Sequence, residues 1–287
     1  MKKNFSPLGV FVLTTLIVSL CSVISMTLAY ATAYGKAIGY FSTGAVMPVV
    51  AILLSLLFTA GIFGDAVLVN RTHKDPLCFG NPLWFRVVCV LIGAGFFGIA
   101  LLDLRANATL LTTSTLVPVL AGFFGGVHFL LRAIRPSSPL PMTLTGIAVI
   151  VRLALAIGQT YFNWEIPMNA PVKLYLQLGC VAAMFFLLRD MKTTVTPTRS
   201  LVTLLSLGLG TLFTGISSLP ILIAYFRRDL GTLEIFPTPF LLLLLWIYCL
   251  FRMLTLFTSP KEEPTEATPS PEEEAPSLVE NDTLDPS

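Results

Sequence analysis

The sequence predicts an all-α, polytopic integral membrane protein, a bundle of about eight transmembrane helices with an acidic tail at its carboxyl end. Hydrophobic residues make up 55% of the 287 positions and charged residues 12%, whereas about 25% charged is typical of a soluble domain. Apolar runs long enough to cross about 30 Å of hydrocarbon recur along the chain. The composition then changes abruptly after residue 258. A water-soluble fold could not cover itself with so few charges.

Eight apolar spans are expected in the first 258 residues, each separated from the next by a short segment with charged residues, Pro, Gly or Asn. They cover residues 8–33, 45–69, 83–102, 110–131, 143–162, 171–188, 201–226 and 237–257. The first span has features of a signal peptide, because Lys2 and Lys3 precede it and Ala29-Tyr30-Ala31 offers small residues. Its apolar stretch is longer than a usual signal sequence, so we expect an uncleaved first helix.

The segment 259–287 differs in kind from the helical domain 1–258. It is rich in Pro and holds 9 acidic residues against one Lys, a net charge of −8, whereas residues 1–258 hold 17 basic and 7 acidic residues, a net charge of +10. Such a tail buries too little apolar area to offset its ordering entropy, so we expect disorder. A protein partner that binds through this acidic tail is one hypothesis.

The distribution of basic residues predicts the orientation in the cell membrane. One side of the bundle carries ten Lys and Arg in short loops and the other carries five, and the richer side is expected to be cytoplasmic. An even number of spans then leaves both the N- and the C-terminus in the cytoplasm. Arg227 and Arg228 oppose this rule. The excess of basic residues is therefore explained by orientation in the lipid bilayer, which is the expected partner of the chain. We expect no nucleic-acid partner.

Ionisable residues inside hydrocarbon are the default candidates for function, because they are costly to bury. The candidates taken from the expected spans are Asp65, Arg86, His128, Arg152 and Arg252. All but Arg152 lie within a turn or two of the inner interface. For Arg86 and Arg252 we expect the long side chain to extend, or snorkel, to the headgroups.

Arg152 differs from the other four because it lies deep within its span. It is nine residues from the start, which at 1.5 Å per residue is roughly 14 Å and close to the midplane. Thr145, Arg152 and Gln159 are spaced by seven and therefore share one helix face. That face is expected to point into the bundle, toward a partner, water or a ligand.

The partner of Arg152 has two alternatives in the sequence. A carboxylate is the simplest, and Asp65 is the obvious buried candidate, but Asp65 matches the depth of Arg86 on the next antiparallel span better. If Asp65 pairs with Arg86, then Arg152 is left for an anionic ligand or a lipid headgroup. A structural role for Arg152, paired with Asp65 or capping backbone carbonyls, stays open.

Small residues and prolines suggest how the helices pack. Pro48, Pro118 and Pro220 lie inside expected spans and permit interrupted helices of the transporter kind. Glycines allow close helix contact in the third, fourth and seventh spans, and Gly122 and Gly126 form a GxxxG match. These glycines are Gly93, Gly95, Gly98, Gly122, Gly125, Gly126, Gly208, Gly210 and Gly215.

Several catalytic motifs are missing from the sequence. It has no GxxxxGK[ST] phosphate loop, no HExxH and no GxSxG. Its two histidines and five scattered cysteines show no metal-ligand spacing. We therefore expect neither a metal nor a cofactor, and a non-enzyme is favoured over an enzyme.

The leading functional hypothesis is a small permease, or the membrane subunit of a transporter, for a small anionic or zwitterionic solute. Arg152 would bind the anion, Gln159 and Gln177 would donate hydrogen bonds, and Asp65 would couple a proton or cation. Arg86 adds basic charge to the inner half and completes the candidate ligand-binding set.

Two hypotheses from other classes stay open. A non-catalytic membrane scaffold or partner subunit fits the glycine faces and the acidic tail. An intramembrane enzyme acting on lipid would use Asp65 and His128 as acid and base.

Overall fold

The computed structural model describes residues 6–35, 39–72, 77, 79–106, 113–134, 139–164, 166–167, 169–195, 200–227 and 237–257. Within these residues, eight helices are long and apolar enough to cross a membrane, which agrees with the expected all-α class and confirms the number of spans. The acidic tail, with its expected disorder and partner role, lies outside the described residues, as do Lys2, Lys3, Lys36, Lys74 and Arg228.

Several helices run further than the apolar runs that predicted them. Their bounds are α1 Pro7–Ala33, α2 Val46–Thr72, α3 Leu83–Ala106, α4 Thr113–Ile134, α5 Pro139–Phe162, α6 Pro171–Val195, α7 Ser200–Phe226 and α8 Thr238–Leu254, with a short 3-10 turn at Thr255–Phe257. The third and sixth predicted spans ended directly before Asp103 and Arg189, but the helices continue past both residues. Helices α3 and α6 therefore include Asp103 and Asp190, acidic residues that were expected in loops.

Local sequence explains how individual elements begin and turn. Ser6 caps α1 by accepting a hydrogen bond from the Gly9 amide at 3.2 Å, and Pro7 follows at the first helical position, where its missing amide hydrogen costs nothing. A two-residue hairpin, β1 Tyr34–Gly35 and β2 Tyr40–Phe41, joins α1 to α2 and was not predicted. Gly39 supplies the positive φ of 71° that its turn requires.

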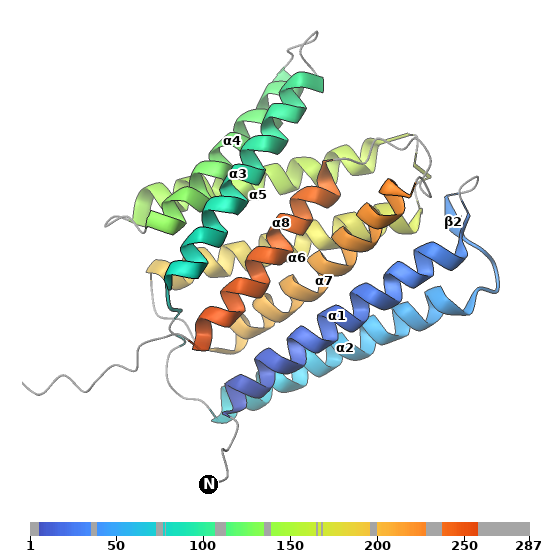
Figure 1. Ribbon diagram of the computed structural model, residues 1–287, viewed down its shortest axis with the longest axis horizontal. Coiled ribbons are helices and arrows are strands. Elements are labelled where there is room, and N and C mark those ends of the chain that lie inside the picture. The colour runs from blue at the N-terminus through green and yellow to red at the C-terminus, as the bar shows by residue number, and fades with distance from the viewer. Residues whose placement is uncertain are drawn as a thin grey trace, which may run out of the picture.

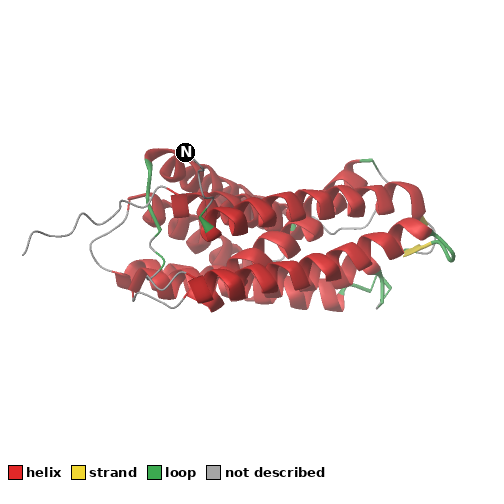
Figure 2. Ribbon diagram, turned by 90° about the horizontal axis from the view of Figure 1, so that it is seen from below, coloured by secondary structure: helices red, strands yellow, loops and turns green. Residues whose placement is uncertain are grey.

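Successive helices run antiparallel, and several of the helices pack around α7 (Figure 1). Helix α7 contacts α1, α2, α6 and α8, while α3 and α4 form a pair on the opposite side of α8. Helix α5 links the two groups by packing on α4 and α6. Seen at 90° to that view, the helices extend along a common long direction (Figure 2). Helix α1 begins and α8 ends at the same end of the bundle, which we call the proximal end; the opposite end is the distal end (Figure 1).

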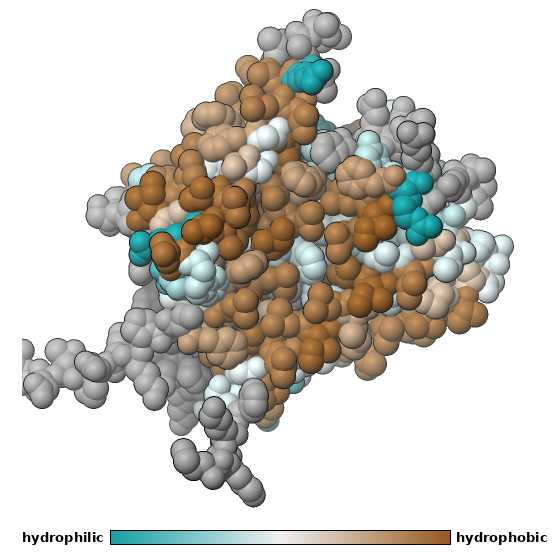
Figure 3. Space-filling model, in the orientation of Figure 1, coloured by the Kyte–Doolittle hydropathy of each residue, from teal (hydrophilic) through white to brown (hydrophobic). Residues whose placement is uncertain are grey.

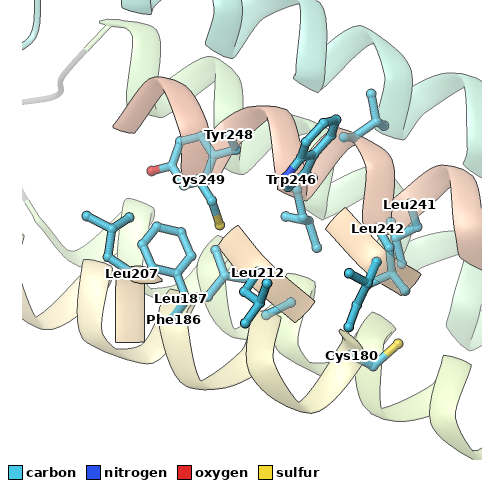
Figure 4. Packing of buried hydrophobic residues seen from close by; sticks show 14 of the residues in the cluster. Cys180, Phe186, Leu187, Leu207, Leu212, Leu241, Leu242, Trp246, Tyr248 and Cys249 are labelled. Carbon is cyan, nitrogen blue, oxygen red and sulfur yellow. The ribbon is translucent and has the colours of Figure 1, made fainter. Parts of the chain in front are cut away.

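The apolar core lies where α6, α7 and α8 meet, and apolar side chains also cover the outside. Phe186, Leu212 and Cys249 pack there with no more than 3% of their surface exposed (Figure 4). Figure 3 shows a largely hydrophobic outer face. On α1 the exposed residues recur at helical spacing as Leu13, Ile17, Leu20, Ile24 and Leu28. A helix with one side packed and the other exposed and apolar is suited to lipid contact.

Most of the glycines in α3, α4 and α7 do mark close helix contacts. A Cβ added to Gly93 would lie 3.0 Å from the carbonyl oxygen of Gly126, and one on Gly122 would lie 3.3 Å from the Ala100 Cβ. Gly98 is an exception, because a Cβ there would meet nothing within 4 Å. The interrupted helices were not found: α4 and α7 continue through Pro118 and Pro220, and Pro48 lies in the first turn of α2, where its missing amide breaks no helical bond.

Candidate functional site

Arg152 on α5 forms an ion pair with Asp103 on α3, which we call the distal pair. Arg152 is 1% exposed, and its Nη2 donates to Asp103 Oδ2 at 2.8 Å. Its Nη1 donates to Gln159 Oε1 at a longer 3.5 Å, one face of α5 carrying both residues as predicted. The Asp103 side chain keeps 17% of its surface exposed. The pair therefore joins a fully buried cation to a carboxylate that reaches the surface.

One atom of the distal pair lacks a hydrogen-bond partner. Arg152 Nε is fully buried and has no acceptor among the described residues. A buried donor that is left unpaired costs about 1–3 kcal/mol relative to one that is satisfied. The site therefore has one hydrogen-bond donor that the described residues leave unused.

Of the alternatives left open for Arg152, the structure shows a carboxylate partner, but this carboxylate is Asp103 and not Asp65. The third span was predicted to end at residue 102, which put Asp103 in a loop. In the structure α3 continues to Ala106, so Asp103 occupies the last turn of a helix that faces the bundle. The long Arg152 side chain extends toward the distal end to meet it.

A second group of buried charges lies at the proximal end and consists of Arg132 on α4, Asp190 on α6, and Tyr248 and Arg252 on α8. We call these four residues the proximal cluster. Asp190 Oδ1 accepts from Arg132 Nη2 at 2.9 Å and from Arg252 Nε at 2.8 Å. The Tyr248 hydroxyl donates to Asp190 Oδ2. One carboxylate thus ties together three helices.

Neighbouring residues hold the two arginines of the proximal cluster in place. The Arg252 guanidinium lies over the ring of Phe79 at 4.1 Å and near that of Phe85 at 5.6 Å. Arg132 Nη1 approaches Met142 Sδ at 3.6 Å. His128 lies one turn before Arg132, and its Nδ1 is 3.0 Å from the Met142 carbonyl oxygen. The cluster is consequently packed against α3, α5 and the segment that carries Phe79.

The snorkelling expected for Arg252 was wrong. Arg252 is 4% exposed and Arg132 6%, and both point to Asp190 rather than to the headgroups. The sequence interpretation missed Asp190 because the sixth span was ended at residue 188. The signal available was the charge itself: an acidic residue directly after an apolar span, level with two arginines that close neighbouring spans.

The remaining predicted site residues do not join either group. Asp65 is half-buried on α2, which packs on α1 and α7. Arg86 is exposed, and its Nε donates to the Asn81 carbonyl oxygen at 3.3 Å. The described residues show no ion pair between Asp65 and Arg86, and no hydrogen bond between Asp65 and His128. Gln177 is half-buried on α6.

The two groups differ in net charge. The distal pair sums to zero, whereas the proximal cluster holds two guanidinium groups against one carboxylate and carries an excess of +1. No set of three His, Cys, Asp or Glu residues suited to a metal ion occurs in the part of the chain that the structure describes. What both groups can do chemically is bind oxyanions, since guanidinium donors match carboxylate and phosphate geometry.

Comparisons with protein-family models, with curated proteins and with solved structures found no match to this chain.

Proposed function

We propose that the chain is a multi-pass protein of the cell membrane that acts as a small permease, or as the membrane subunit of a transporter, for a small anionic or zwitterionic solute. Eight apolar helices of spanning length support the membrane class. The surplus of Lys and Arg at the proximal end supports a cytoplasmic position for both termini.

The distal pair is the observation that carries the proposal. A deeply buried Arg152 with an unpartnered Nε faces a carboxylate that is itself partly exposed. In the empty protein Asp103 neutralises Arg152. A solute carboxylate that enters from the distal end displaces Asp103 and gains the second donor that Asp103 leaves unused. Asp103, rather than Asp65, is therefore the carboxylate suited to the exchange.

The polar residues near the distal pair fit a solute that also carries a donor or a cation. Gln159 already contacts Arg152 through its side-chain oxygen and is exposed. Gln177 lies on α6, the helix that packs against α5. A displaced Asp103 would be free to accept a bond from the amino group of a zwitterion. The proposal consequently covers amino acids and simple carboxylates.

Counterflow uptake into proteoliposomes tests the proposal. The probes are radiolabelled acetate, lactate and glycine, each with the same unlabelled solute inside. Arg152→Lys keeps the charge but loses the fork of donors, and we expect uptake to fall at least about tenfold because a charge-assisted bond is lost. Arg105→Lys, in the same distal region of α3, is the matched control and should transport as the parent does.

Two results would contradict this function. The first is an absence of counterflow for every probe in a monodisperse, folded preparation. The second is uptake by Arg152→Lys equal to that of the parent, which would leave Arg152 with a structural role only.

A membrane scaffold is a second candidate function, and helix α2 favours it. Helix α2 is the least buried of the eight, with 22% of its apolar window inside the bundle. A Cβ added to Gly61 or Gly64 would meet nothing within 4 Å, so small residues lie open on the outer face. Small outward residues allow another helix to approach closely. Gly61→Ile should release a co-purifying membrane protein if this function holds, whereas Gly158→Ile, at an equally open position on α5, should not.

A further inference from the structure

The proximal cluster has one more positive charge than its carboxylate can neutralise. Asp190 is the one carboxylate that bonds to Arg132 or Arg252 among the described residues. All three side chains are no more than 7% exposed. An uncompensated charge at such depth is costly, and proteins reduce the cost by pairing it. The surplus therefore calls for an anion from outside the described chain.

Arg252 has the donors that this anion would need. Its Nε is committed to Asp190, but no hydrogen bond within the described part of the chain uses its Nη1 or Nη2. These two nitrogens, unlike Arg152 Nε, are not among the buried atoms sealed from solvent. Nη1 and Nη2 together form one edge of the planar guanidinium group, which we call the fork. That edge binds two oxygens of a phosphate side by side.

The orientation of this fork is fixed by its surroundings. Phe79 stacks on the guanidinium plane at 4.1 Å, and Asp190 holds Nε at 2.8 Å. The Gly80 amide donates to the Thr255 carbonyl oxygen at 3.3 Å, which ties the segment carrying Phe79 to the end of α8. A fork held on its face and on one edge loses little entropy when it binds a ligand. The Arg252 guanidinium is therefore held in a fixed orientation by residues of the chain before any ligand binds.

We propose that the proximal cluster binds a phosphate group through Arg252, with Arg132 supplying the second positive charge. The group comes from a phospholipid headgroup or from a soluble phosphate at the proximal face. Asp190 positions both arginines and Tyr248 positions Asp190, so neither of these need touch the anion. The site is separate from the distal pair and does not rest on the proposed transport function.

The test uses the full chain purified in maltoside detergent and freed of phospholipid, as checked by phosphorus analysis. Intrinsic tryptophan fluorescence follows the unfolding midpoint. In one arm, inorganic phosphate replaces chloride at constant ionic strength. In the other, phosphatidylglycerol is compared with diacylglycerol, which lacks the phosphate. We expect a saturable rise of the unfolding midpoint. A rise with inorganic phosphate would indicate a soluble phosphate, and a rise with phosphatidylglycerol alone would indicate a lipid headgroup.

Variants then assign the effect to Arg252. Arg252→Lys keeps the charge but not the fork, and its apparent affinity should fall at least about tenfold because a bidentate, charge-assisted contact is lost. Arg189→Lys, on a half-exposed arginine next to Asp190, is the matched control and should bind as the parent does. Phe79→Leu leaves every charge in place and removes the stacking ring. It should weaken binding severalfold, and it serves if Arg252→Lys does not fold.

Three results would overturn the phosphate site. One is the lack of a saturable rise in both arms. Another is an equal rise in the parent and in both site variants. The third is a rise of the unfolding midpoint that occurs only after deletion of residues 259–287. This result would mean that carboxylates of the acidic tail occupy Nη1 and Nη2 of Arg252 in the full chain.

Discussion

The two ends of the bundle solve the problem of a buried arginine differently. At the distal end one guanidinium meets one carboxylate, and the Asp103 side chain stays 17% exposed. At the proximal end two guanidinium groups share Asp190, whose side chain is 3% exposed and is also bonded to Tyr248. The distal pair is neutral and reaches the surface. The proximal cluster is charged, branched and enclosed.

This difference separates a contact that can exchange from one that holds the fold. Breaking the distal pair frees a carboxylate that water can reach, and it leaves one buried cation, Arg152, without a counter-charge. Breaking the proximal cluster leaves two cations in a low-dielectric interior, and that cost is high. This contrast agrees with the proposed solute exchange at the distal end and with a structural tie, next to the proposed anion site, at the proximal end.

Removal of the Asp190 carboxylate should have the largest effect. Asp190→Asn leaves Arg132 and Arg252 without a counter-charge, and we expect a loss of about 3–5 kcal/mol of stability. Thermal unfolding in detergent measures it. Asp65→Asn, on a half-buried carboxylate of α2, is the control and should change stability much less.

A second substitution sharpens this prediction. Arg132→Gln added to Asp190→Asn removes one of the two unbalanced charges, so the double variant should recover part of the lost stability. Equal stability of Asp190→Asn and Asp65→Asn would show that the cluster does not hold the helices together.

Neutralising Asp103 should cost less than neutralising Asp190. Asp103→Asn keeps an acceptor for Arg152 and leaves one buried cation without a counter-charge rather than two, so we expect a loss of about 2–3 kcal/mol. The same unfolding assay applies to both variants. A loss of stability as large as that of Asp190→Asn would show that the distal pair holds the fold as strongly as the proximal cluster does, which contradicts the difference between the two ends.

The smallest expected effect comes from two glycines of α5, one near each end. A Cβ on Gly146 would lie 2.2 Å from Met191 Sδ and 3.1 Å from His128 Cε1, beside the proximal cluster, whereas one on Gly158 would meet nothing within 4 Å. Gly146→Ala should cost about 1 kcal/mol, since the flexible Met191 side chain can move aside. Gly158→Ala should be neutral or more stable by up to about 1 kcal/mol, because Ala favours helix. A loss at Gly158 as large as that at Gly146 would contradict the tighter proximal packing.

The sequence predicted the helices well and the charged sites only in part. Long apolar runs give the number of spans directly, and the spacing of Arg152 and Gln159 gave their shared face. Asp103 and Asp190 were missed for one physical reason: a charged residue lowers local hydropathy and so ends a predicted span, although buried ion pairs allow a helix to continue through it. The Asp65 and Arg86 pairing failed because similar depth does not make two helices neighbours.

The affinity of the Asp103→Asn variant for a small carboxylate tests the central claim most directly. If Asp103 competes with the solute for Arg152, then its neutralisation should tighten binding of the probe that the parent transports by about tenfold, which is the loss of one competing ion pair. Arg152→Lys in the same binding assay should abolish the gain. An unchanged affinity in Asp103→Asn, or a loss equal to that of Arg152→Lys, would contradict the exchange.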